Sequence, residues 1–131
     1  MWKKYLMTVL SGLSLSYGAA IAAPTHLIIH NTTDVESNAY IAGSIPSVHP
    51  SKSHSDNKVF WGLVKLSCQK HIVNNTCQAL IKMETNTTHP VDLGMVTLNL
   101  ASGEITPASI TNNGYSLTIN GPAEVTLTTA G

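Results

Sequence analysis

The chain has 131 residues, of which only 11% are charged, and its formal net charge at pH 7 is zero. Residues 23–131 hold five lysines against seven carboxylates, a formal charge of −2, and no arginine. A domain without a basic patch or a guanidinium group lacks the electrostatic footprint of proteins that bind nucleic acids or phosphorylated ligands. We therefore expect no nucleic-acid partner.

The first 22 residues have the pattern of a cleavable secretory signal. Two lysines precede a mostly apolar run from Tyr5 to Ala19, and the small-residue sequence Ala20-Ile21-Ala22 follows it. The apolar run is short and interrupted by serine and glycine, so it falls below the roughly 20 residues that a spanning helix needs. We predict a signal peptide over 1–22 and one exported mature domain over 23–131, periplasmic or secreted, with no membrane span.

The next strand signals lead into a long polar segment. Residues 27–30 and 39–42 have the composition of short strands, and residues 44–57 then contain two prolines, five serines and two histidines but little that is apolar. We expect 44–57 to be an exposed loop or an irregular crossing between the two sheets.

Cys68 and Cys77 are the only cysteines of the chain. A single pair in an exported protein predicts a disulfide rather than a redox or metal site. Residues 58–68 and 77–86 both have strand composition, and a hairpin in which the cysteines face each other would place the bridge on an apolar, buried face. We therefore predict a hairpin disulfide, worth about 2.5–3 kcal/mol through loop closure.

The C-terminal half alternates apolar and polar residues, which is the period of half-buried strands, over 96–100, 115–119 and 125–127. Glycine and asparagine turn signals separate these runs, and no helix is expected in the mature chain. Short strands at this spacing predict an all-β fold, a small antiparallel β-sandwich of about seven strands. The last strand, 123–129, could lie at a sheet edge.

An aromatic and aliphatic patch is the best candidate for a binding surface. In the predicted hairpin, Trp61 points away from the disulfide beside Leu63 and across from Leu80, on a face that should otherwise be wet. The competing interpretation is that Trp61 packs in the core beside the bridge, because a shift of one residue in register would bury it.

Six histidines raise the question of a metal site: His26, His30, His49, His54, His71 and His89. Their spacings match no metal-binding motif, and strand geometry keeps His26 and His30 about 13 Å apart. We expect no metal and no cofactor, unless His26, His30, His71 or His89 converge in the fold.

No catalytic motif is present, so we expect a non-enzymatic protein. There is no nucleophile elbow, and the carboxylates of Glu84 and Asp92 lack partners that would suggest a sugar cleft. The sequence favours an exported protein-interaction or structural domain, such as a secreted virulence or surface factor, with another protein as its partner. The alternatives are an accessory subunit of an envelope secretion or surface assembly, a histidine-based metal or small-ligand carrier, and a small hydrolase using Glu84 or His89.

Overall fold

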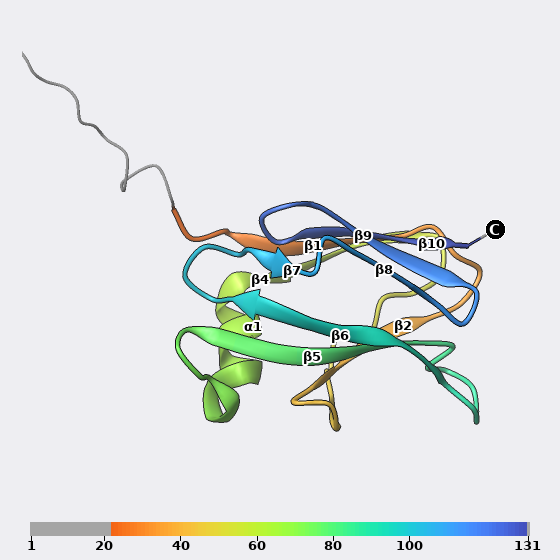
Figure 1. Ribbon diagram of the computed structural model, residues 1–131, viewed down its shortest axis with the longest axis horizontal. Helices are drawn as coiled ribbons and strands as arrows, with labels where there is room; N and C mark the ends of the chain where they lie inside the picture. The colour runs from red at the N-terminus through yellow and green to blue at the C-terminus, as the bar shows by residue number, and fades with distance from the viewer. Residues whose placement is uncertain (1–21, 131) are drawn as a thin grey trace, which may run out of the picture.

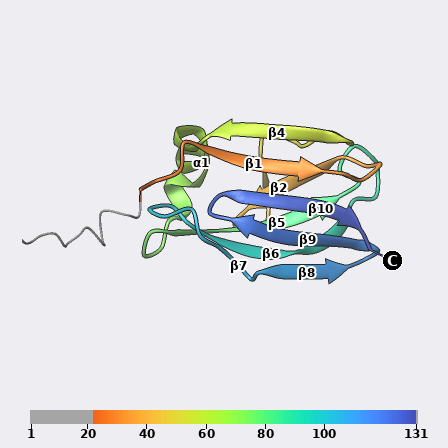
Figure 2. The same cartoon turned by 90° about the horizontal axis from the view of Figure 1, so that it is seen from above.

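The computed structural model describes residues 22–130, and two five-stranded sheets packed face to face make up most of it (Figures 1 and 2). Sheet A has the order β4 (Ser55–Phe60), β1 (His26–Asn31), β10 (Glu124–Thr129), β9 (Tyr115–Gly121) and β8 (Ser109–Asn112). Sheet B has the order β3 (Ile45–Pro46), β2 (Ser37–Ile41), β5 (Thr76–Met83), β6 (Val91–Asn99) and β7 (Ile105–Thr106). The predicted β-sandwich is confirmed, with ten described strands. The predicted signal peptide lies almost wholly outside the described residues.

All neighbouring strands are antiparallel except β1 and β10, which run parallel. This pairing places β10 between β1 and β9, so the suggestion that the last strand lies at an edge was wrong. The edges of sheet A are β4 and β8, and those of sheet B are β3 and β7.

The core lies between the sheets and follows the two-residue period of the strands. Leu117 pairs with Leu127 in sheet A, and both are almost fully buried, as are Met83 and Leu93 of sheet B. Burying a side chain of this size stabilises the fold by roughly 1.5–3 kcal/mol. The alternation read from the sequence is therefore the pattern that closes the sandwich.

The predicted hairpin over 58–68 was wrong, because the second part of this segment is helical. Strand β4 ends at Phe60, and helix α1 (Trp61–Cys68) with the 3₁₀ turn η3 (Gln69–His71) leads into β5. The buried residues of α1 are Trp61, Val64 and Cys68, at the i, i+3, i+7 spacing of one helix face. Strand β5 pairs instead with β2 and β6.

Tertiary contacts explain why the helix prevails. Turning into a helix brings Trp61 into the core at 4% exposure, where its indole N–H donates a 3.0 Å hydrogen bond to the carbonyl of Leu100. The backbone N–H of Trp61 also donates to the carbonyl of Thr25 at 2.9 Å. Burial of a large aromatic group with its polar atom satisfied outweighs the strand propensity of the segment.

The predicted disulfide is present, but it joins α1 to β5 instead of two paired strands. The Cα atoms of Cys68 and Cys77 are 6.0 Å apart, and both residues are buried. The bridge therefore fastens the helix across one end of the sandwich. Figure 1 shows α1 at this end, on the left.

The segment 44–57 is less exposed than predicted. Val48 is 82% exposed, but Ser51 is buried, and residues from Ser55 onward belong to β4. The backbones of Ser37 and Ser51 exchange two hydrogen bonds of 2.9 and 2.7 Å, which the polar composition of the segment did not reveal. The segment crosses from the β3 edge of sheet B to the β4 edge of sheet A and closes that long side of the sandwich.

Candidate functional site

The most unusual surface of the described chain is the segment 60–73, which we call the helical lobe. Within residues 22–130, eight large hydrophobic side chains are exposed, and five of them belong to this lobe: Phe60, Leu63, Leu66, Ile72 and Val73. Single exposed hydrophobic residues are normal, but several within one short segment indicate a binding surface.

The geometry of α1 explains why these side chains face solvent. Its inner face is occupied by Trp61, Val64 and Cys68, so Leu63 and Leu66, three residues apart, lie beside each other on the outer face. Leu66 is 63% exposed, and no described element covers it. The disulfide holds the C-terminal end of the helix in place, so this surface is presented by a fixed element.

The charge on the lobe is entirely positive. No aspartate or glutamate occurs between residues 57 and 83, whereas Lys58, Lys65 and Lys70 lie within or beside the lobe and are exposed. None of these three lysines forms a salt bridge with another residue in 22–130; the lysine that does is Lys82, 3.4 Å from Asp92. His26 borders the lobe, with its ring centroid 4.7 Å from that of Phe60.

The structure does not bring Trp61, Leu63 and Leu80 together as one patch. Trp61 is in the core, Leu63 is exposed on α1, and Leu80 lies on the outer face of sheet B, paired with Tyr40 and Met95. The prediction failed because it treated 61–68 as a strand. Strand alternation also places Phe60 and Leu66 on the buried face. Only the i, i+3, i+7 spacing of Trp61, Val64 and Cys68 could have indicated a helix that exposes Leu66.

His30 lies on the outer face of sheet A between two carboxylates. Its Nδ1 is 2.7 Å from Asp56 and its Nε2 is 2.7 Å from Glu124. Hydrogen bonding to Asp56, followed by that to Glu124, raises the pKa of His30 above its usual 6.5. Because both ring nitrogens point at carboxylates, the protonated form of the ring, in which both nitrogens donate, is favoured over the neutral form.

The other histidines do not converge with His30. His54 contacts Asp34, His71 ends η3, and His89 lies in the turn before β6. Within residues 22–130 no group of three or more histidine, cysteine or acidic side chains is arranged to hold a metal ion.

Glu84 and Asp92 are engaged in separate interactions. Tyr115 donates a 2.7 Å hydrogen bond to Glu84, and this bond is the main reason that the pKa of Tyr115 rises to about 12. Asp92 pairs with Lys82. These contacts tie the ends of strands together.

Comparison with known families now adds to this geometry. The family model described as "T2SS substrate NttC" matches residues 2–130. The chain belongs to the NttC family of type II secretion system substrates. The crystal structure of the Legionella pneumophila type II secretion system substrate NttC is 52% identical, covers 82% of this chain and 99% of that chain, and superimposes with a TM-score of 0.81. No curated protein matches.

Membership of the NttC family confirms the predicted export. A type II secretion substrate passes through the periplasm to the outside, so the chain is a secreted protein and the cargo of a secretion system. In residues 22–130 no helix has the length and apolar character needed to span a membrane.

Proposed function

We propose that this secreted NttC-family protein is a non-enzymatic binding domain that docks on another protein through the helical lobe. The observation that carries the proposal is the gathering of five exposed hydrophobic side chains in a segment whose only charges are positive. Secreted proteins act on what they meet outside the cell, and a surface of this kind is suited to binding.

The apolar part of the lobe supplies the energy of docking. Covering a side chain such as Phe60 or Leu66 completely contributes roughly 1.5–3 kcal/mol, and a few such anchors dominate many interfaces. The disulfide and the core contacts of Trp61 already fix the helix, so little conformational entropy is lost on binding.

The charged part of the lobe selects the partner. Three exposed lysines around an apolar centre favour a partner surface with carboxylates around its own apolar centre. Such pairs accelerate association and weaken as salt screens them, with a Debye length of about 8 Å at physiological ionic strength. The proposed partner is therefore a protein with an acidic, partly apolar surface.

A matched pair of variants tests this proposal. Leu66→Glu places a carboxylate in the lobe, and Val48→Glu makes the same kind of change at an even more exposed position outside it. Partners are captured with the tagged mature protein from the medium and from the cell surfaces that the secreted protein meets, and are identified by mass spectrometry. We expect one stoichiometric partner that Val48→Glu retains and Leu66→Glu loses by tenfold or more, the equivalent of about 1.4 kcal/mol.

Two outcomes would overturn the proposal. A partner that both variants bind equally would place the docking surface elsewhere. Binding of the protein to phosphatidylserine vesicles but not to phosphatidylcholine vesicles, with no protein partner captured, would make the lobe a membrane-surface element.

A further inference from the structure

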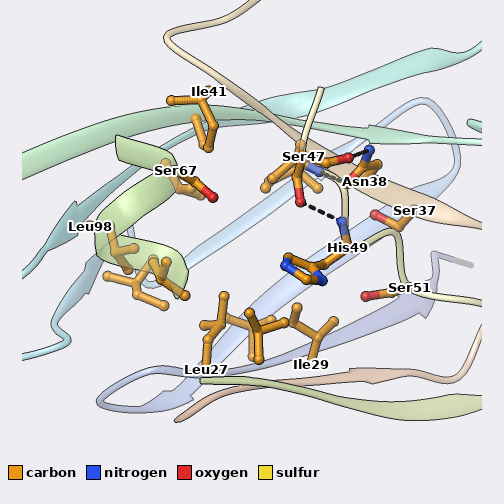
Figure 3. A pocket seen from close by; sticks show the side chains of 18 of the residues that line it. Leu27, Ile29, Ser37, Asn38, Ile41, Ser47, His49, Ser51, Ser67 and Leu98 are labelled. Carbon is orange, nitrogen blue, oxygen red and sulfur yellow. Dashed lines mark hydrogen bonds between the residues drawn. The ribbon is translucent and has the colours of Figure 1, made fainter. Parts of the chain in front are cut away.

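A cavity of about 120 Å³ lies between the two sheets, beneath the loop that closes their β3 and β4 edges (Figure 3). Protein cores are close-packed and leave few voids larger than a water molecule. An apolar cavity of about 150 Å³ is large enough to bind benzene. The space in this sandwich is thus of a size that takes a small apolar group.

The cavity exists because small residues face inward at this side of sheet B. Strand β2 contributes Ser37 and Ala39, and β5 contributes Ala79, whereas other inward positions of sheet B hold residues as large as Met83 and Leu93. Large side chains form the remaining walls, among them Leu27 and Ile29 of β1 and Leu98 of β6. The side chains of both sheets thus make a mostly apolar lining.

Apart from Ser67 of α1, whose hydroxyl is bonded to the Leu63 carbonyl, the polar groups of the cavity gather at one side, under residues 47–51, which we call the strap. The strap is fixed to β2 by the bond from the Ser47 N–H to the Ala39 carbonyl at 2.8 Å and by the backbone pair of Ser37 and Ser51. Between these attachments, Val48 faces solvent and the imidazole of His49 points into the cavity, as Figure 3 shows.

The ring of His49 makes no hydrogen bond to any residue in 22–130, although its backbone N–H donates to the Ser47 hydroxyl at 2.9 Å. A neutral imidazole offers one N–H donor and one nitrogen acceptor. Water deeper in the cavity would lack the two to four polar partners that it requires. A ligand with an apolar part for this space and a polar part for the imidazole of His49 suits the site better.

We propose that this cavity binds the aliphatic end of an acyl chain, with the carboxylate or ester oxygen of the ligand on His49. At about 120 Å³ the cavity is somewhat smaller than one that holds benzene, which leaves room for roughly four carbons of a chain. The site does not depend on the proposed protein docking, because none of the five exposed hydrophobic side chains of the helical lobe lines it. The ligand is either a free carboxylic acid or an acyl chain drawn from a lipid.

Neighbouring residues on β5 provide the test. Ala79→Leu fills the cavity from its wall, whereas Gln78→Leu is the same kind of change on the exposed face of the same strand. The ¹⁵N-labelled mature protein is titrated with butyrate, hexanoate and octanoate, and separately mixed with phosphatidylcholine vesicles, with amide shifts and co-sedimentation as the readouts. Thermal unfolding of each variant checks that it is folded, and Ala39→Leu replaces Ala79→Leu if that variant is not.

We expect saturable shifts at the amides of Ala39, Ala79 and the strap, which Gln78→Leu preserves and Ala79→Leu weakens by tenfold or more. His49→Ala should reduce the preference for hexanoate over hexanol. Shifts with the free acids would show that the ligand is a free carboxylic acid. Binding to vesicles but not to the free acids would show that the ligand is a lipid acyl chain, provided that Ala79→Leu abolishes this binding. Absence of both, or binding that Ala79→Leu leaves unchanged, would overturn the proposal.

Discussion

Removal of the disulfide tests how the helical lobe is held on the sandwich. The bridge of Cys68 and Cys77 closes a loop with a sequence separation of 9 residues. In the chain-entropy treatment, a loop of about ten residues contributes about 2.7 kcal/mol at 25 °C. Both cysteines are also buried, so Cys68→Ala/Cys77→Ala should lower the free energy of unfolding by about 3 kcal/mol.

This loss is a large share of the 5–15 kcal/mol that stabilises a typical domain. For about 110 residues, an unfolding entropy of about 2.1 cal/mol/K per residue converts 3 kcal/mol into a fall in Tm of roughly 13 °C. Urea denaturation provides the assay, because Trp61 is the only tryptophan in residues 23–131 and lies in α1 itself. Its fluorescence follows the lobe while far-UV circular dichroism follows the sheets.

The bridge restrains the unfolded chain, and in the folded state the core contacts of α1 are sufficient to keep the helix in place when the bridge is absent. The folded double variant should therefore keep the native fluorescence maximum of Trp61, and wild-type protein in reducing agent should unfold at nearly the same urea concentration as the variant. A loss of stability below about 1 kcal/mol would refute the loop-closure argument. In the double variant, a tryptophan transition that precedes the circular dichroism transition would show that the core contacts alone do not keep α1 in place.

Four further substitutions have effects whose direction the structure fixes. Trp61→Phe leaves the buried carbonyl of Leu100 without its donor and should cost about 2 kcal/mol in urea denaturation, with a cost below 0.5 kcal/mol contradicting the contact. The pKa of His30, followed by NMR titration, should lie above 6.5 and fall in Asp56→Asn. Because that pKa is raised on folding, the stability contributed by protonated His30 is complete below pH 6.5 and is lost as the pH rises through the pKa of the folded state. His30→Gln should therefore remove this fall in the free energy of unfolding with rising pH. Gly103→Ala should destabilise the fold by more than about 1 kcal/mol, because the backbone φ is +82° there and an added Cβ would clash, whereas an unchanged Tm would exclude that turn geometry.

The parts of the fold that follow short-range rules were predictable from the sequence. Alternation over 115–119 and 125–127 reflects one buried face in each of β9 and β10, and two cysteines in an exported chain have few alternatives to bonding with each other. The export signal is equally local. These features gave the sandwich, the bridge and the secreted location.

The helix was not predictable in the same way, because residues 60–68 suit two periods. Strand alternation places Phe60 and Leu66 on the same side as Cys68, inside the sandwich. Helical geometry turns Leu66 by about 200° relative to Cys68 and exposes it, while Trp61 moves inward. The burial of Trp61 and its contacts with Leu100 and Thr25, both distant in the sequence, decide between the two.

The candidate sites depended on the same long-range information. Leu63 was correctly placed at the surface, but its neighbours in the predicted patch were wrong because Trp61 and Leu80 belong to different faces of the fold. The cavity was beyond sequence reasoning, since it requires knowing that Ala39 and Ala79 line the same space beneath His49.

Hydrogen–deuterium exchange on the complex with its captured partner tests the central claim most directly. If the helical lobe is the docking surface, peptides covering residues 60–73 should gain protection on binding, while peptides covering the exposed part of the strap around Val48 and the outer face of sheet A should not change. Protection confined to an edge strand such as β4 or β8, with the lobe unchanged, would show that the partner adds to a sheet edge and would contradict the account.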